Sequence, residues 1–502
     1  MKSTQTNLAS KKATPCETVL ESPSHAKRFE IQTNTAAETR LLRKIDVHLI
    51  PILFVMYLFA FLDRVNIGNV KIQGLLTDLQ MTGTDFNIAS MVLFVPYILL
   101  EVPSNIIMKK VRPSIWLSGL MFFWALTTIC QGFVTSYGGL LVCRVFLGVF
   151  ESGFFPGAVY LISMYYKRFE LQKRLVLFFS SSLVAGAFGG LLAFALAKMQ
   201  GLRGYNAWRW IFIIEGLATM VAAIASFFLV PDWPEQTKFL TSEEKDMLRS
   251  RLDLDQAAGV ARMDTLNKHS LKLIFRDWKI WTGTIFYVCA TTTGYSTAFF
   301  IPTILNEFGY SPSSAQLHTI PVYAVSFVLT LFCAWWSDRV QHRYTFTIGG
   351  LLLAVIGYII LLAQGSLHIQ HRLPIGVRYA AIFFITAGNF ITQPLVVVWL
   401  TNNLAGHYKR SFGAAIQIGI GNFGGIIGSN IYLPSESPYY KTGYSTGMAL
   451  LLVGGLLSTI QFLGMRYENM KRDNGGRDYR FSLPEERLEN LGDDHPHFRF
   501  NS

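Results

Sequence analysis

Two pairs of oppositely charged residues lie inside hydrophobic stretches, where charge is costly. Arg144 and Glu151 are seven residues apart in the apolar run LLVCRVFLGVFESGFFPGAVYLI, and Asp63 and Arg64 end the first apolar run. Each charge inside a membrane-spanning helix costs roughly 2.5–3.5 kcal/mol on insertion scales. Seven residues are about two helical turns, which places Arg144 and Glu151 on one face of a helix, toward the protein interior. Arginines held there can bind an anion, and carboxyl groups there can exchange protons.

Each pair also has a purely structural interpretation. Arg144 and Glu151 would then only stabilise helix packing through a fixed ion pair, and Asp63 with Arg64 would anchor a helix end at the membrane surface. We favour function for the first pair because charges within spans mark transport pathways and proton relays. For the second pair, Leu49–Leu62 gives only about 21 Å of helix, too short for a ~30 Å hydrocarbon core. The helix must therefore continue through both charges.

The composition is that of a membrane protein. Of 502 residues, 51% are hydrophobic and 15% are charged, whereas soluble proteins carry about 25% charged residues. The formal net charge of +12 comes from basic residues between the hydrophobic runs rather than from one basic stripe. This distribution argues against nucleic-acid binding. It is typical of loops that stay on the cytoplasmic side of a membrane.

Long apolar runs recur along the chain, and runs of about 20 residues predict twelve spans. A polar stretch with the segment SEEKDMLRSRLDLDQ, typical of a surface helix, separates the sixth span from the seventh. We therefore expect an all-α integral membrane protein with twelve transmembrane helices in two six-helix halves. The predicted parts are a disordered cytoplasmic tail (1–45), an N-terminal six-helix bundle (46–230), a cytoplasmic linker (231–277), a C-terminal six-helix bundle (278–467) and a cytoplasmic tail (468–502).

The distribution of Lys and Arg among the loops predicts the orientation. Eleven lie on the side of the N-terminus and eight on the opposite side, so we expect both termini in the cytoplasm. The polar N-terminal stretch lacks the apolar core of a cleaved signal peptide. We expect the protein in the plasma membrane.

Several motifs in fixed order resemble those of a known family. They are LDRVNIGNV at 62–70, YILLEVPSN at 97–105, RVFLGVFESGFFPG at 144–157, WRWIFIIEG at 208–216, PDWPEQTKFLT at 231–241, WWSDRVQHR at 335–343 and WLTNNLAGHYKR at 399–410. With these motifs, residues 45–467 resemble the major facilitator superfamily, and within it the anion:cation symporter family, in the fungal branch of allantoate, nicotinate and vitamin permeases. One departure is Lys109, which stands where the superfamily usually has an acidic residue.

The resemblance implies roles for the charged pairs. The arginine at the position of Arg64 meets the carboxylate of the substrate, and the one at Arg144 supports it. Asp63 and Glu151 match proton carriers. A dry cavity raises the pKa of a carboxyl group and a nearby arginine lowers it, so such a group can switch protonation. An anion that competes for Arg144 would weaken its pairing with Glu151 and favour protonated Glu151.

Further residues are candidates for the cavity and for the gates. Tyr97, Trp399 and Asn422 could contact a substrate, although an aromatic or amide side chain in a span serves packing more often. Asp338, Arg339 and Arg343 resemble the gate of the second half. Glu215 and Arg209, both in WRWIFIIEG, fit structural contacts with neighbouring helices better than substrate contacts.

The sequence lacks the motifs of a metal site, of ATP hydrolysis and of enzyme catalysis. His368 and His371 have metal-compatible spacing but no acidic or cysteine partners, so we expect no metal site. No Gly-Lys pair of a phosphate loop occurs, and no catalytic triad, so neither an ATP-driven pump nor an enzyme is expected. The proton would be the coupling ion, without any cofactor.

The leading hypothesis is import of a small organic anion by proton symport and alternating access. A nicotinate-like monocarboxylate, a vitamin or a ureide would be the substrate. The alternatives are an exporter of an anionic secondary metabolite or drug, and a receptor that binds its ligand without net transport. The expected partners are the anion and the lipid bilayer, and the expected state is a monomer.

Overall fold

The computed structural model describes residues 35–257, 268–340, 342–366, 373–484, 488 and 490–501. Most of the predicted N-terminal tail (1–45) lies outside the described residues, and so do His368 and His371. The first helix begins at Thr35, earlier than the predicted boundary at 46. The compact unit Val47–Ser502 contains the helices discussed below, apart from the first turns of that helix.

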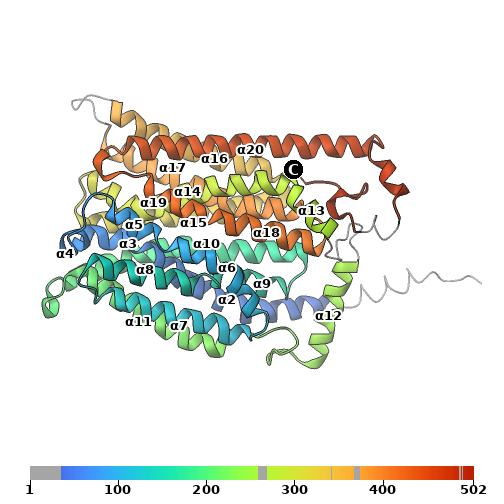
Figure 1. The fold of residues 1–502 in the computed structure, drawn as a ribbon, viewed down its shortest axis with the longest axis horizontal. Coiled ribbons are helices and arrows are strands. Elements are labelled where there is room, and N and C mark those ends of the chain that lie inside the picture. The colour runs from blue at the N-terminus through green and yellow to red at the C-terminus, as the bar shows by residue number, and fades with distance from the viewer. Residues whose placement is uncertain are drawn as a thin grey trace, which may run out of the picture. The chain divides into compact units, whose positions relative to one another are not determined.

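The elements before the linker form the first helix group (Figure 1). They are α2 (Thr35–Val65), α3 (Ile67–Val70), a π-helix (Lys71–Leu75), α4 (Leu76–Asp78), α5 (Asp85–Met91), α6 (Phe94–Met108), α7 (Pro113–Gln131), α8 (Tyr137–Glu151), α9 (Phe154–Ser163), α10 (Arg168–Leu196), short 3-10 helices (Ala197–Met199, Leu202–Gly204) and α11 (Ala207–Leu229). Two helices lie in the linker, α12 (Ser242–Ala257) and α13 (Lys268–Arg276). The predicted surface helix corresponds to α12.

The second helix group follows the linker. It comprises α14 (Trp278–Glu307), α15 (Pro312–Val340), α16 (Arg343–Ser366), α17 (Ile375–Asn402), α18 (His407–Gly421), α19 (Phe423–Asn430), a 3-10 helix (Pro434–Glu436) and α20 (Lys441–Asp473), with 3-10 turns after it (Asp478–Ser482, Gly492–Asp494). Every regular element in the described ranges is a helix. The prediction of an all-helical, multi-pass membrane protein is confirmed.

Ten helical stretches are long and apolar enough to cross a membrane, counted over the described residues. They coincide with ten of the twelve predicted spans. The other two predicted spans correspond to α14 and to α18 with α19. These helices carry many Thr, Gly and Tyr residues, which lower their hydropathy. Both contribute to the cavity described below, so their polar side chains face protein rather than lipid.

The first span continues past its charged residues, as its length predicted. Asp63 and Arg64 lie in the last turn of α2, and α3 and the π-helix extend the same rod. The regular helix is interrupted near Gln73 and Gly74, where Gly74 adopts a φ of 95°. Only glycine takes such a φ at little cost. Both charges therefore lie well inside the helical rod.

Small residues let the two helix groups approach each other. α10 packs against α15, and α3 packs against α14. A Cβ atom at Gly190 of α10 would collide with the side chain of Thr319, and one at Gly68 of α3 would collide with the carbonyl of Phe299. Close contacts of this kind, made by glycine backbone, are typical of packed membrane helices.

The C-terminal segment after α20 folds back toward α13 and α14 (Figure 1). Asp493 is fully buried and forms ion pairs with Lys279 Nζ at 2.9 Å and Lys409 Nζ at 2.8 Å. Asp277 also accepts from both lysines. Arg472 donates to the backbone carbonyls of Asp493, His495 and Phe498. The predicted tail (468–502) is thus a folded part of the second helix group over its described residues.

Candidate functional site

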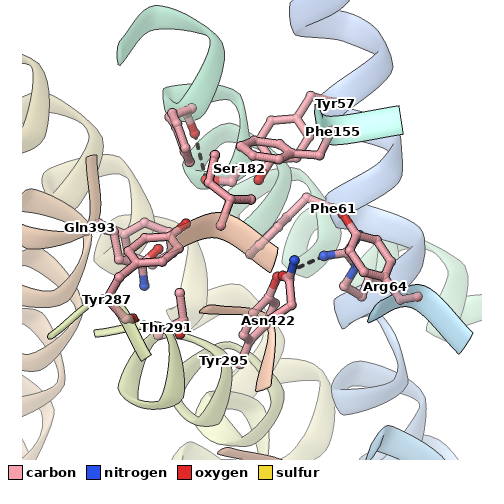
Figure 2. A pocket seen from close by; sticks show the side chains of 15 residues that line it. Tyr57, Phe61, Arg64, Phe155, Ser182, Tyr287, Thr291, Tyr295, Gln393 and Asn422 are labelled. Atoms are coloured by element: carbon pink, nitrogen blue, oxygen red, sulfur yellow. Dashed lines mark hydrogen bonds between the residues drawn. The ribbon is translucent and has the colours of Figure 1, made fainter. Parts of the chain in front are cut away.

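A pocket with about 530 Å³ of empty space, open solvent included, lies between the two helix groups (Figure 2). The first group contributes Tyr57, Phe61 and Arg64 of α2, Tyr97 of α6, Phe155 of α9, and Phe179 and Ser182 of α10. The second group contributes Tyr287, Thr291, Gly294 and Tyr295 of α14, Phe390 and Gln393 of α17, Ile418 of α18, and Asn422. Arg64 is the one charged residue in this lining, as far as the structure describes it.

Arg64 binds partners from two other helices. Its Nη2 lies 2.6 Å and its Nε 2.8 Å from Oε2 of Glu151 on α8. Its Nη1 donates to the hydroxyl of Tyr295 at 2.8 Å. The side chain of Arg64 is only 4% exposed, and that of Glu151 is buried. A guanidinium in such a dry site forms strong, directional hydrogen bonds to carboxylates.

Aromatic rings surround the guanidinium. Its Cζ lies 4.8 Å from the ring centroid of Tyr97 and 6.0 Å from that of Tyr295. Tyr295 packs edge-on against Phe94 at 4.9 Å between centroids. Rings of this kind stabilise the cation and offer flat apolar surfaces to a ligand.

A second polar contact joins the two helix groups. Asn422, between α18 and α19, donates to Oε2 of Glu101 on α6 at 3.2 Å. Both side chains are buried. Asn422 thus lies at the cavity, where the sequence placed it, and Tyr97 lies there as well.

Two more carboxyl groups are buried behind the cavity, between α2 and α11. Asp63 Oδ2 accepts from the hydroxyl of Thr219 at 2.9 Å. Glu215 Oε2 accepts from the amide of Asn66. Glu215 therefore contacts Asn66, the residue between α2 and α3. Neither carboxyl group reaches the cavity lining.

Arg144 is placed differently from its predicted position. It is 1% exposed, donates from Nη1 to the carbonyl of Arg64 at 3.2 Å, and lies 5.8 Å from the ring centroid of Phe212. The predicted pairing of Arg144 with Glu151 is corrected, because Glu151 pairs with Arg64 instead. Seven residues advance a helix by about 10.5 Å, whereas Arg64 of α2 lies directly at the Glu151 carboxylate.

Trp399 also lies away from the cavity. Its Nε1 donates to the carbonyl of Asn501 at 3.1 Å, and its ring packs with Met465 and Phe500. The predicted substrate contact of Trp399 is corrected to a contact with the C-terminal segment. Position along α17 decides this, since Phe390 and Gln393, nine and six residues before Trp399, reach the cavity.

The remaining predicted residues form contacts at helix ends. Arg209 donates to the carbonyls of Gly132 and Val134 at 3.1 and 2.7 Å. Asp338 lies 3.4 Å from Arg343. The Cζ of Arg339 lies 5.6 Å from the ring centroid of Trp335. The contacts of Arg209 and of Asp338 with Arg343 hold the loops after α7 and α15, whereas the contact of Arg339 lies within α15.

Sequence reasoning missed several cavity residues, above all Tyr287, Tyr295 and Gln393. None belongs to a motif or carries a charge. The low hydropathy of α14 and the run of Thr around residue 292 were a usable signal, because a polar helix within a bundle has to face a polar space. Over the described residues, no group of three or more His, Cys, Asp or Glu side chains could hold a metal ion.

Comparison with known proteins identifies the family. Residues 53–429 match the Major Facilitator Superfamily, which is most of the chain. The chain belongs to the Major Facilitator Superfamily. As a major facilitator it is a secondary transporter of the membrane and not an enzyme.

Several fungal relatives of this major facilitator match over nearly their full length. An uncharacterized transporter of Schizosaccharomyces pombe, C1002.16c, is 35% identical, with 92% of this chain and 91% of the relative covered. The MFS-type transporter cnsO of Penicillium expansum is 35% identical, with 93% and 91% covered. The major facilitator-type transporter hxnP of Emericella nidulans is 30% identical, with 88% and 89% covered.

The fold agrees with a solved major facilitator structure. A bacterial homolog of the human lysosomal transporter Spinster, in an inward-facing and occupied conformation, superposes with a TM-score of 0.62. The match covers 84% of this chain and 97% of that chain at 16% identity. At that identity the likeness shows the fold alone.

Proposed function

We propose that this major facilitator imports a small organic anion together with protons, by symport and alternating access. The substrate class is a nicotinate-like monocarboxylate, a vitamin or a ureide, as expected for a permease of the anion:cation symporter family in the fungal allantoate, nicotinate and vitamin branch. The transporter works as a monomer in the plasma membrane, with both termini in the cytoplasm.

Arg64 is the observation that carries this proposal. It is the charged residue of the described cavity lining. Its guanidinium binds Glu151 through Nη2 and Tyr295 through Nη1. A buried guanidinium without a matching anion is costly, so a ligand that displaces these partners has to bring an acceptor. A carboxylate fits the fork geometry.

Coupling to protons follows from the competition for Arg64. In the empty cavity Arg64 and Glu151 neutralise each other. When a substrate carboxylate takes over Arg64, the charge of Glu151 loses its partner, and burial then favours the protonated form of the carboxyl group. The loaded site has the same net charge as the empty one. After release of the substrate, Glu151 loses its proton and pairs with Arg64 again.

The walls of the cavity support a flat substrate. Tyr57, Tyr97, Tyr287 and Tyr295 offer rings and hydroxyl groups, and Gln393 offers an amide. An aromatic or planar amide ligand could stack on these rings while its carboxylate binds Arg64.

The test is uptake of labelled organic acids into vesicles that contain the purified protein, with the outside at pH 5 or pH 8. The panel includes nicotinate and allantoate. We expect acid outside to drive accumulation of one carboxylate, and Arg64→Ala to abolish it. Lys238→Ala, an exposed linker residue, is the matched control for loss of a positive charge and should transport normally.

Other outcomes would overturn the proposal. Accumulation that does not depend on the pH difference would contradict proton symport. Release of a preloaded anion against its gradient, without uptake, would favour the exporter. Binding without movement of any panel member would favour a receptor.

A further inference from the structure

We propose that Glu215 of α11 binds and releases a proton during the transport cycle, acting with Asp63 across the contact between α2 and α11. This inference rests on the proposed proton-driven import. It adds a proton-binding residue beyond the Arg64–Glu151 pair, at a site that does not touch the cavity.

The two carboxyl groups are held by matching contacts one turn apart. Thr219 donates to Asp63 at 2.9 Å, and Asn66 donates to Glu215. Asp63 and Asn66 are three residues apart on one rod, while Glu215 and Thr219 are four residues apart on α11. The carboxyl groups are therefore neighbours along one buried interface.

The amide of Asn66 has a fixed orientation. Its Oδ1 accepts from Nδ2 of Asn69 at 2.8 Å, so its own Nδ2 must face Glu215. Asn66 and Glu215 are at most 1% exposed. A neutral amide donor satisfies one oxygen of Glu215 without supplying a positive charge.

The charges around this interface do not balance if every acid is ionised. Asp63, Glu151 and Glu215 are all at most 1% exposed. Arg64 is paired with Glu151, and Arg144, which is 1% exposed, donates to the carbonyl of Arg64. Arg144 alone is left for the other two acids. An uncompensated buried carboxylate is expensive, so one of the two carries a proton in this state.

Other charged groups of the adjoining elements are engaged elsewhere. The Nζ of Lys71, in the π-helix, lies 4.4 Å from the ring centroid of Phe86 and 4.9 Å from that of Phe300. Lys198, near the end of α10, lies over the ring of Phe194.

Over the described residues, the remaining charged groups of α11 and of the helices beside it lie toward the helix ends. Arg209, on α11 itself, donates to backbone carbonyls of the loop after α7. α7 packs against α11, and its buried polar side chains, among them Thr128 and Gln131, are uncharged. The charged residues of α10 lie in its first two turns. Tyr165 comes just before these turns, and its hydroxyl donates to the carbonyl of Asp232, which follows the end of α11.

Unfilled hydrogen-bonding atoms mark the path for the proton. Oδ1 of Asp63 and Oε1 of Glu215 have no hydrogen-bond partner among the described residues, and neither have Nε and Nη2 of Arg144. Protonation turns a carboxyl oxygen into a donor. A proton that moves between Glu215 and Asp63 leaves one of the two acids ionised in either position, so the net charge of the interface is kept.

The test compares two kinds of transport in vesicles, using the anion that the wild-type protein accumulates. Proton-driven accumulation requires the carrier to bind and release protons, whereas exchange of internal for external anion does not. We expect Glu215→Gln to reduce proton-driven accumulation at least tenfold while exchange stays above half of the wild-type rate. Glu243→Gln, on the exposed face of α12, is the matched control and should keep both.

A second variant separates proton binding from packing. Glu215→Asp is shorter but keeps the carboxyl group, so accumulation should persist with a shifted pH profile. A packing role predicts the reverse, because Gln preserves the shape and the contact with Asn66 whereas Asp does not. Normal accumulation by Glu215→Gln would overturn the inference. If Glu215→Gln is not recovered from membranes, an unshifted pH profile of Glu215→Asp overturns it instead.

Failure of this inference is distinguishable from failure of the proposed function. If wild-type accumulation ignores pH, the proposed symport itself is wrong. If Glu151→Gln loses proton-driven accumulation and Glu215→Gln does not, the proposed symport is supported. Only the proposed role of Glu215 is then wrong.

Discussion

Arg64 of α2 and Tyr295 of α14 connect the two helix groups through one hydrogen bond of 2.8 Å. The same guanidinium binds Glu151 within the first group. A ligand that occupies Arg64 therefore changes an ion pair inside one group and a contact between the groups at once. Alternating access requires such a link, because ligand binding has to bias the movement of one helix group against the other.

Replacement of Arg64 by Lys tests whether the anion needs the paired hydrogen bonds of a guanidinium. Lys keeps the charge but has a single ammonium group and cannot bind a carboxylate with paired hydrogen bonds. We expect the KM for the transported anion to rise roughly 10- to 100-fold, as for the loss of a hydrogen bond to a charged group. The concentration dependence of uptake measures this, and an unchanged KM would speak against direct binding at Arg64.

Replacement of Tyr295 by Phe tests the link between the helix groups. The ring and its packing against Phe94 remain, whereas the acceptor for Arg64 is lost. We expect the free energy of unfolding of the empty transporter to fall by about 1.5–3 kcal/mol. Chemical denaturation in detergent micelles measures the change. Tyr467→Phe, on an exposed residue, should have no effect. Equal free energies of unfolding for the two variants would refute the contribution of the Arg64–Tyr295 hydrogen bond.

Gly148 tests the close approach of α8 to α6. A Cβ atom there would collide with the carbonyl of Leu93, and backbone cannot move aside as a flexible side chain can. We expect Gly148→Ala to lower the free energy of unfolding by about 1–3 kcal/mol. Gly119→Ala in α7 is the matched control, because a Cβ atom there meets nothing within 4 Å, and Ala favours helix. A stability loss in the control, or none in Gly148→Ala, would contradict the packing.

Asp493 tests the fold of the C-terminal segment. Asp493→Asn removes the negative charge between Lys279 and Lys409, which are 7% and 1% exposed. Loss of one partner of a buried ion pair costs about 3–5 kcal/mol, so we expect the segment to detach and become sensitive to protease. Asp473→Asn is the control, since its pair with Arg499 is 61% and 42% exposed and such pairs contribute at most about 1 kcal/mol. Equal protease resistance of Asp493→Asn and wild type would refute the role of Asp493 in holding the C-terminal segment.

The docking of this segment should weaken in acid. Burial, His497 and Arg472 lower the pKa of His495 below its ordinary value of 6.5. The segment therefore favours neutral His495, and its stability is complete above pH 6.5 and decreases as the pH falls through the lower pKa of the folded state. Protease sensitivity should rise between pH 7.5 and 5.5, and His495→Gln should flatten this rise.

Asp493 acts in the same direction at lower pH. Burial opposes its ionisation, but Lys279 and Lys409 outweigh burial and hold the pKa of Asp493 below its usual range. The stability that it adds is therefore present above its unfolded pKa and disappears only when the pH falls through the depressed folded value. A loss of docking on raising the pH from 5.5 to 7.5 would contradict both assignments.

Sequence alone determined the features that depend on local composition. The lengths of the apolar runs gave the helices and the all-helical membrane fold, and the length of the first run placed Asp63 and Arg64 inside it. Charges in spans singled out Asp63, Arg64, Arg144 and Glu151, because burial of a charge is costly wherever the helix lies.

Only the tertiary structure decided which of these residues meet. Arg144 and Glu151 share a helix, yet about 10.5 Å of helix axis separates them, and Arg64 reaches Glu151 from α2 instead. Trp399 contacts Asn501, while uncharged Tyr295 lies at Arg64. Periodicity fixes the face of a residue on its own helix, whereas its partner depends on how distant helices cross, and that follows from the packing of the whole bundle.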